Sequence, residues 1–326
     1  MDLIESYSEE LKLTRKAGTK AWVLTVLVAA FLLPLYAPEH MVYTASLIAI
    51  FSIGVVGQNL LIGYTGQISF GQAGLLCIGC YTFGHLARAG VPWLVALLGA
   101  GLVTALFGIL VGFPSLRLKG PYLAIATFAF AIAVYQIFVN SALLSGGRMG
   151  LVITKLEPIL GLSRVNYYYY LNLIIMLLFT LTAYNIVSSY MGRAFVAIRD
   201  NDIAAEILGV NLTFYKLLSF AISSFYVGVQ GGLYALFIGY LEPNMFGLHE
   251  TINFLVAIIV GGLGFVEGGI FGAAFVVLVP QIFSETQAFV PVVYGLAITI
   301  ILIFDPGGLA GRLLKIRLYF RNWPFR

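Results

Sequence analysis

Charged residues are scarce in this sequence of 326 amino acids. Asp, Glu, Lys and Arg together make up 10% of the chain, whereas hydrophobic residues make up 60%. A soluble domain usually has about 25% charged and about 45–50% apolar residues, so this composition excludes an ordinary soluble globular protein. The net charge of +4 is too small to indicate a nucleic-acid-binding protein. The composition is that of a polytopic membrane protein.

The residue types that carry most catalytic and metal chemistry are also few. The sequence contains neither a G-x-x-x-x-G-K-[ST] phosphate-binding loop nor an H-E-x-x-H motif. The three histidines, His40, His85 and His249, are too far apart in sequence to suggest a metal cluster. Cys77 and Cys80 lie within an apolar run, where we expect two buried thiols rather than a redox pair. We therefore expect no enzyme activity and no cofactor on this chain.

Long apolar runs fill most of the sequence. A membrane-spanning helix needs about 20 apolar residues, and continuous runs favour helices over the short alternating strands of a β-barrel. Runs of this kind, separated by breaks that contain Pro, Gly or charge, fall at 21–37, 41–62, 67–87, 91–113, 121–143, 167–189, 213–239, 251–264, 268–283 and 288–304. We predict an all-α polytopic membrane protein of about ten transmembrane helices, some of them short or broken.

The basic residues indicate how the chain is oriented. If residue 1 is cytosolic and every run crosses the membrane, only Arg88, Arg148, Lys155 and Arg164 lie outside, and the other 14 of the 18 Lys and Arg lie inside. The positive-inside rule favours this orientation, with both termini cytosolic. We expect a cytosolic segment at 1–20, a membrane domain at 21–304 and a cytosolic basic tail at 305–326. The first run lacks a small-residue cleavage site and is predicted to be a retained helix.

The inner loop at 190–212 has the pattern of a short helix. Asp200 or Asn201 can cap the N-terminus of such a helix, and Asp202 favours its first turn. Gly209 is placed to end the helix in a left-handed conformation. We therefore predict a helix of about two turns on the cytosolic surface.

This short helix would have one apolar face. Ile203 and Ile207, and likewise Ala204 and Leu208, are separated by four residues and share a side of the helix. Such a face suits docking into a groove of a soluble partner. The alternative is an ordinary interfacial helix that lies on lipid headgroups.

Two glycine clusters stand next to neutral polar residues. The clusters have the same spacing of three, five and three residues, and they are Gly63, Gly66, Gly71 and Gly74, and Gly261, Gly264, Gly269 and Gly272. Clustered glycine permits broken helices or close helix contact. The neighbouring amides and hydroxyls are predicted to line a path for a polar, uncharged or zwitterionic solute, and they are Asn59, Gln67, Ser69, Gln72 and Asn253. The alternative is that they join helices by hydrogen bonds.

The acidic residues bear on the source of energy. Nearly all of the 14 Asp and Glu lie in loops or at helix ends, and only Glu267 is a candidate for membrane depth, at the inner face. Ion-driven carriers usually keep a carboxylate near the middle of the membrane. We therefore expect the energy to come from another chain. A stand-alone secondary carrier or channel is the alternative, and an intramembrane enzyme is the least supported class.

Four stretches carry a resemblance to a known family. They are residues 59–74, residues 114–125, residues 198–211 with 215–218, and residues 261–264. In these stretches the sequence resembles the permease subunits of bacterial branched-chain amino-acid ABC importers, the LivM type, and the resemblance extends over about residues 41–305. Gln72 stands where a His is common in the family, and this departure leaves the substrate open.

The resemblance implies the partners and the site. It implies pairing with a second permease subunit, as a heterodimer, and with two cytosolic ATPases that bind ATP and Mg. An extracytoplasmic solute-binding protein would deliver the solute. It also implies that the inner loop is the coupling helix on an ATPase, with Asp202, Ala204, Ala205, Glu206, Gly209 and Asn211. The expected substrates are branched-chain or related neutral amino acids, or alternatively urea or short amides, and the expected location is a bacterial or archaeal plasma membrane.

Overall fold

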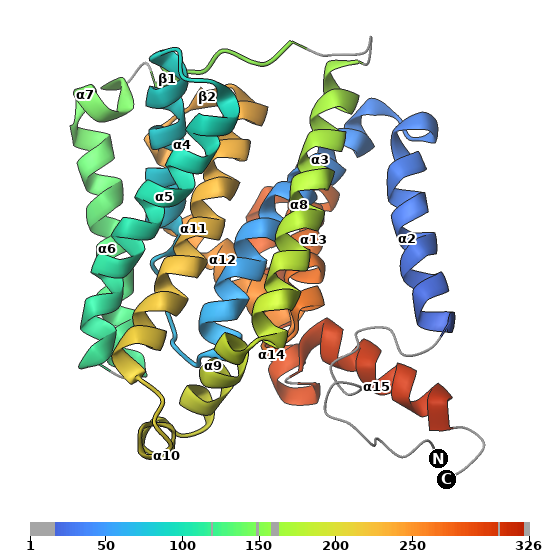
Figure 1. Cartoon of the computed structure of the whole chain (residues 1–326). Coiled ribbons are helices and arrows are strands. Elements are labelled where there is room, and N and C mark those ends of the chain that lie inside the picture. The colour runs from blue at the N-terminus through green and yellow to red at the C-terminus, as the bar shows by residue number, and fades with distance from the viewer. Residues whose placement is uncertain (1–16, 119, 148–149, 158–162, 306, 323–326) are drawn as a thin grey trace.

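The computed structural model describes residues 17–118, 120–147, 150–157, 163–305 and 307–322. Residues 1–16 of the predicted N-terminal segment therefore lie outside the described residues, as do the basic residues Lys119, Arg148 and Arg326. Each of the ten apolar runs forms a helix, and most of these helices run along a common direction (Figure 1). In chain order they are α2 (Ala17–Tyr36), α3 (Glu39–Asn59), α4 (Gln72–Arg88), α5 (Trp93–Gly112), α6 (Pro121–Asn140), α8 (Arg164–Ser188), α11 (Leu212–Ile238), α12 (Leu248–Gly261), α13 (Val266–Ile282) and α14 (Val290–Phe304).

The other elements connect these helices or, in the case of α15, follow the last one. They are η1 (Leu60–Tyr64), η2 (Phe113–Leu116), α7 (Ala142–Ser145), β1 (Leu151–Val152), α9 (Tyr190–Asp200), α10 (Asp202–Ile207), β2 (Tyr240–Leu241), η4 (Pro243–Phe246), η5 (Ser284–Phe289) and α15 (Gly308–Asn322). β1 and β2 pair antiparallel, with Leu151 opposite Leu241. This two-stranded sheet and α10 lie at opposite ends of the molecule (Figure 1). We call these ends the sheet end and the α10 end.

Six described helices are long and apolar enough to cross a membrane. They are Glu39–Tyr64, Trp93–Leu116, Pro121–Asn140, Arg164–Ser188, Leu212–Ile238 and Pro243–Gly261. A seventh span results if Val290–Phe304 and Gly308–Ile316, which meet at 43°, are taken as one broken helix. Thr25–Tyr36 and Val266–Ile282 are apolar but shorter. The helical, polytopic class is therefore confirmed, whereas the count of about ten crossings and the sidedness stay predictions.

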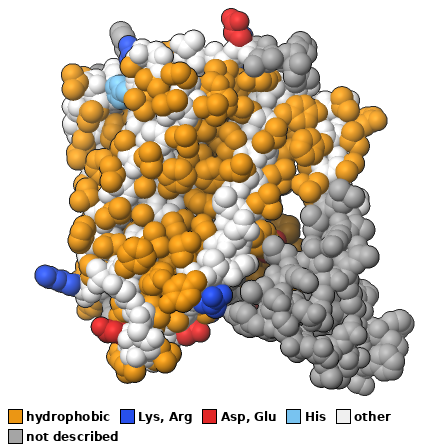
Figure 2. Space-filling model, viewed as in Figure 1, with side chains coloured by type: hydrophobic (Ala, Val, Ile, Leu, Met, Phe, Trp, Pro, Cys, Tyr) orange, Lys and Arg blue, Asp and Glu red, His pale blue; other side chains and the backbone are white. Residues whose placement is uncertain are grey.

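The outer surface has the polarity that a membrane requires. In Figure 2, hydrophobic side chains cover the middle of the visible face, and charged side chains lie near its two ends. On α5, Leu98, Leu102, Leu106 and Leu110 recur every four residues and are each more than half exposed. A continuous apolar stripe of this kind is stable only against lipid or another apolar surface.

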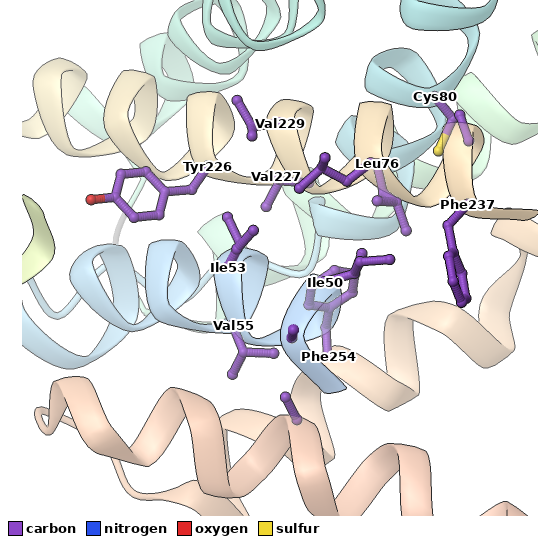
Figure 3. Close-up of a cluster of buried hydrophobic side chains, with 14 of the residues drawn as sticks. Ile50, Ile53, Val55, Leu76, Cys80, Tyr226, Val227, Val229, Phe237 and Phe254 are labelled. Carbon is purple, nitrogen blue, oxygen red and sulfur yellow. The ribbon is translucent and has the colours of Figure 1, made fainter. Parts of the chain in front are cut away.

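The interior is built around α11, which packs against α3, α4 and α5. Small residues allow the backbones to approach closely, because a Cβ on Gly79 would lie only 2.7 Å from the Cα of Gly228. Ile53, Leu76 and Phe254 come from α3, α4 and α12 and meet in the same buried cluster (Figure 3). This packing fixes the position of α11 relative to three other helices.

Both glycine clusters lie at breaks between helices, as expected. The first break runs from the π-helical turn η1 through residues 65–71, where Gly66 has a φ of +73°. The second break separates α12 from α13, with φ of +120° at Gly262 and +79° at Gly264. The two breaks touch, because a Cβ on Gly63 would clash with the backbone of Gly264.

The predicted C-terminal tail begins with a turn and continues as α15. Lys315 Nζ donates a hydrogen bond of 2.8 Å to Asp305 Oδ1 and thereby ties α15 to the end of α14. The same hydrogen bond lowers the pKa of the Asp305 carboxyl.

Candidate functional site

The inner loop forms the predicted short helix, α10. Asn201 caps it, since its Oδ1 accepts a hydrogen bond of 3.0 Å from the backbone N–H of Ala204. Gly209 follows the helix with a φ of +87°, a conformation that side chains with a Cβ rarely adopt. Both ends of α10 are therefore fixed by the residues from which the helix was predicted. Asn211 has a separate role, because its Oδ1 accepts from the N–H of Phe214 and caps α11.

The apolar face of α10 points away from the protein. Ile203 is 65% exposed, Ile207 is 81% exposed and Leu208 is 82% exposed. Ala204 and Glu206 are exposed as well, whereas Ala205 is buried against the bundle. Three large apolar side chains on a charged end of the molecule form a surface that burial would stabilise.

An ion pair joins α10 to α11. Lys216 Nζ lies 3.6 Å from Asp202 Oδ2, and the Lys216 side chain is only 9% exposed. Sequence reasoning counted Lys216 among the inner basic residues but did not assign it to the site. The sequence contained a signal for this role of Lys216, because a lysine in the second turn of an apolar helix must find a partner or a polar cavity.

A cavity of about 380 Å³ opens beside this ion pair. We call it the α10-end cavity. Its walls come from the first glycine break, the loop before α6, the α9–α10 junction and α11, and they include Gln67, Ser115, Leu123, Arg199 and Lys216. Arg199 Nη1 also donates a hydrogen bond of 2.9 Å to the carbonyl of Gly63. A smaller space of about 300 Å³ lies between α10 and η2 and is lined in part by Glu206.

A row of buried polar side chains continues from this cavity along one face of α11. We call this row the polar seam, and its members on α11 are Lys216, Ser219, Ser223 and Gln230. Two predicted site residues face it: Gln67 Nε2 donates to Ser219 Oγ at 3.0 Å, and Gln72 Nε2 donates to Ser223 Oγ at 3.2 Å.

Several amide atoms along the polar seam have no partner among the described residues. Gln67 Oε1 and Gln72 Oε1 are buried without a hydrogen bond, and so are both amide atoms of Gln230. An unpaired buried polar group is costly, so such groups mark places where water or a solute is expected. The spacing of Ser219, Ser223 and Gln230 on α11 was the sequence signal for this row, and it was missed.

The other three predicted path residues make local or structural bonds. Asn59 Nδ2 donates to the carbonyls of Gly262 and Phe265, and its Oδ1 accepts from the N–H of Gly264. Ser69 Oγ accepts from the N–H of Gly71. Asn253 Nδ2 donates to Glu250 Oε2. Their assignment to a solute path stays a prediction, and for Asn59 the geometry favours the alternative of holding helices together.

A buried carboxylate was also missed. Glu250 lies in the first turn of α12, is 8% exposed and belongs to the candidate span Pro243–Gly261. Glu267, the only acid that we expected at membrane depth, is exposed at the start of α13. The difference arises because α12 packs against α3, α4, α13 and α14, so Glu250 is covered although the apolar run starts only at residue 251.

Cys77 and Cys80 are free and buried, as the apolar run around them predicts. Within the described ranges, no three His, Cys, Asp or Glu side chains come together in a way that could hold a metal ion. The site is therefore made of an exposed apolar helix, a buried ion pair and a row of amides and hydroxyls, which suits binding and movement.

Comparison with known families decides the class of protein. The family model described as "Branched-chain amino acid transport system / permease component" matches residues 40–304. The chain belongs to this family. Its members are transport components rather than enzymes, and the resemblance stated from the four sequence stretches is confirmed. No solved structure matches the chain.

Curated relatives from bacteria support this assignment. The chain is 28% identical to the high-affinity branched-chain amino acid transport system permease protein LivM of Salmonella typhimurium, over 89% of this chain and 74% of LivM. It is 23% identical to the autoinducer 2 import system permease protein LsrC of the same organism, over 88% of this chain and 85% of LsrC. It is also 23% identical to the guanosine ABC transporter permease protein NupQ of Bacillus subtilis, over 63% of this chain and 68% of NupQ. Related permeases thus serve systems for different solutes.

Proposed function

We propose that this permease is one of two permease subunits of an ABC importer for branched-chain or related neutral amino acids. Two cytosolic ATPases would bind ATP and Mg and supply the energy, and an extracytoplasmic binding protein would deliver the solute. The assembly would lie in a bacterial plasma membrane with the α10 end in the cytosol. The observation that carries the proposal is the exposed apolar face of α10, which is tied to the polar seam by the Lys216–Asp202 ion pair.

The coupling role of α10 follows from its fixed ends. A short helix passes on motion only if it cannot rotate freely, and here Asn201 and Gly209 fix the two ends while Ala205 is buried beneath it. If an ATPase held Ile207 and Leu208, displacement of α10 would move Asp202 and, through it, Lys216 on α11. Movement of α11 would then shift the hydroxyls that hold Gln67 and Gln72.

The substrate class rests on the match with LivM, because the chain is 28% identical to LivM and 23% identical to LsrC and to NupQ. The polar seam supports a neutral solute, because beyond Lys216 it offers amides and hydroxyls. Urea or short amides fit the same chemistry and stay the alternative. A second permease is proposed because of the match with the permease family and with LivM.

A stand-alone carrier is the competing function, and Glu250 is the observation that favours it. A buried carboxylate in a candidate span is the group that an ion-driven carrier would use. The two functions differ when the purified chain alone is placed in liposomes. We expect no uptake of leucine in response to a proton or sodium gradient, and uptake under those conditions would replace the importer proposal with a carrier.

Coupling is tested with Gly209→Val and Glu206→Lys. A β-branched residue at φ +87° strains the backbone by about 1–2 kcal/mol. No steric clash adds to this strain, because no atom lies within 4 Å of a Cβ at this position. The Lys substitution reverses the charge of an exposed side chain beside α10's apolar face. Both variants should insert normally but lose ATPase co-purification or solute-stimulated hydrolysis in vesicles.

The matched control is Gly209→Asn, because Asn adopts the left-handed conformation more readily than other residues with a Cβ. It should retain both properties nearly in full. Wild-type values for Gly209→Val and Glu206→Lys in both assays would show that α10 is only a surface helix.

A further inference from the structure

The α10-end cavity has walls of two chemical kinds. Leu118, Leu123 and Ile198 form an apolar part. The polar part includes the Lys216–Asp202 ion pair and the neutral amide of Gln67, and a second ion pair, Arg199–Asp200, also lines the cavity. A volume of about 380 Å³ falls within the range of about 300–1,000 Å³ that is usual for small-molecule sites.

Two polar groups of this cavity, on Lys216 and Gln67, are incompletely satisfied. Lys216 can donate three hydrogen bonds, yet its ammonium is nearly buried and lies 3.6 Å from Asp202, beyond good hydrogen-bond distance. Gln67 Oε1 is buried and has no hydrogen-bond partner among the described residues. A buried ammonium and a buried amide oxygen in one cavity would each be stabilised by a ligand with the complementary group.

From this arrangement we propose that the α10-end cavity is a binding site for a zwitterionic amino acid with an aliphatic side chain. The ligand carboxylate accepts from Lys216 Nζ, and its ammonium donates to Gln67 Oε1 and the Asp202 carboxylate. The aliphatic side chain packs against Leu118, Leu123 and Ile198. The proposal rests on the proposed transport of neutral amino acids and adds a site at the cytosolic end of the path.

Occupancy of this site bears on coupling because Asp202 is the first residue of α10. A bound amino acid competes for both members of the Lys216–Asp202 ion pair, which is the link between α10 and α11. Amino acid that accumulates at the cytosolic side therefore loosens this link. The expected consequence is slower ATP-driven import when the cytosolic compartment contains millimolar leucine.

The test measures equilibrium binding of radiolabelled leucine to the permease–ATPase complex in nanodiscs, without the solute-binding protein. Wild type should bind leucine, and Lys216→Met and Gln67→Met should each bind it at least about tenfold more weakly. Lys315→Met is the matched control, because Lys315 also forms an ion pair at the α10 end but does not line the cavity. It should bind like wild type.

Two competitors test the chemistry without any substitution. 4-Methylpentanoate lacks the ammonium and 3-methylbutylamine lacks the carboxylate, so each should displace leucine at least about tenfold less well than unlabelled leucine does. Equal displacement by either analogue, binding unchanged in Lys216→Met, or absence of leucine binding to wild type would overturn the site. ATP-driven uptake of leucine is measured on the same complex. Binding without uptake would reject the proposed transport function and leave the binding site standing. Uptake without binding would reject the binding site and leave the transport function standing.

Discussion

At the scale of single residues, Asn59 shows how one amide can hold two helix breaks together. Its side chain makes three hydrogen bonds to the backbone of residues 262–265, and it is buried. Leucine at this position would leave two carbonyls and one N–H without their partner. Each such group costs about 1–3 kcal/mol when it stays buried.

We predict that Asn59→Leu lowers the free energy of unfolding by roughly 2–5 kcal/mol, because two of the three hydrogen bonds are only partly buried and cost less than the full penalty. The measurement is thermal unfolding of the purified permease in detergent. Gln58→Leu is the control, because Gln58 is equally buried in the adjacent position but its Oε1 has no partner within the described residues. Similar melting temperatures for the two variants would contradict the structural role of Asn59.

Gln72 is the residue at which a solute path and simple helix packing make different predictions. We expect Gln72→Leu to lower transport severalfold while assembly and ATPase binding persist, because it removes both the bond to Ser223 and the unpartnered Oε1. Initial uptake rates in proteoliposomes measure this effect.

The matched control for Gln72 is Asn172→Leu. Asn172 is also a buried amide, its two polar atoms are unpartnered among the described residues, and it lies on α8 rather than along the polar seam. Its substitution should leave transport near the wild-type rate. Transport that survives in Gln72→Leu would assign Gln72 to helix packing.

At the scale of elements, α10 is held on the bundle by one face, and its proposed docking function depends on the opposite face. Its caps and Ala205 hold it on the bundle, whereas Ile207 and Leu208 contribute nothing to that packing. Burial of a large aliphatic side chain in a partner is worth about 1.5–3 kcal/mol. The outward face can therefore be changed without unfolding the helix.

We predict that Ile207→Ser with Leu208→Ser reduces ATPase co-purification at least about tenfold, since about 1.4 kcal/mol corresponds to a factor of ten. The yield of folded permease should not change. Leu143→Ser is the control, because Leu143 is 88% exposed on α7 at the opposite end of the molecule. An equal loss of ATPase in the control, or none in the double variant, would reject α10 as the docking element.

The helix breaks are the second feature at this scale. A break in a membrane helix frees backbone groups that lipid cannot satisfy, so the break must be covered by protein. Here the two breaks cover each other, with Asn59 on one side and Gly264 on the other. This mutual cover explains why glycines cluster at both breaks.

At the scale of the whole molecule, the distribution of charge predicts the orientation in the membrane. At the α10 end, Arg199 lies in the last turn of α9, Lys216 in the second turn of α11 and Lys315 on α15, whereas Arg88 ends α4 and Lys155 lies against Gly239, next to β2, at the sheet end. Cytosolic ends of membrane proteins are enriched in Lys and Arg. The α10 end is therefore expected to face the cytosol.

We predict that a cysteine at position 201 reacts with a membrane-impermeant maleimide only from the cytosolic side, whereas one at position 157 reacts from outside. Both positions are exposed, and the native Cys77 and Cys80 are buried, so the background should be low. Intact cells and inverted vesicles give the two accessibilities. Labelling of Asn201→Cys in intact cells would invert the topology and remove α10 from the reach of a cytosolic ATPase.

The sequence by itself determined the class, the positions of ten helices and the ends of α10. These features depend on local information: apolar runs cannot leave their backbone unpaired in lipid, and Asn201 and Gly209 act on residues within three or four positions. The resemblance to the permease family was also visible in short local stretches, and the family match covers residues 40–304.

Only the tertiary structure decided how distant residues combine. Gln67 and Ser219 are 152 positions apart, Asn59 and Gly264 are 205 apart, and neither pair can be read from periodicity. Glu250 is buried because α12 packs against helices far apart in the sequence, and Lys216 faces a cavity because three separate segments surround it. Burial and cavities depend on the packing of whole helices, and local sequence patterns do not specify which helices become neighbours.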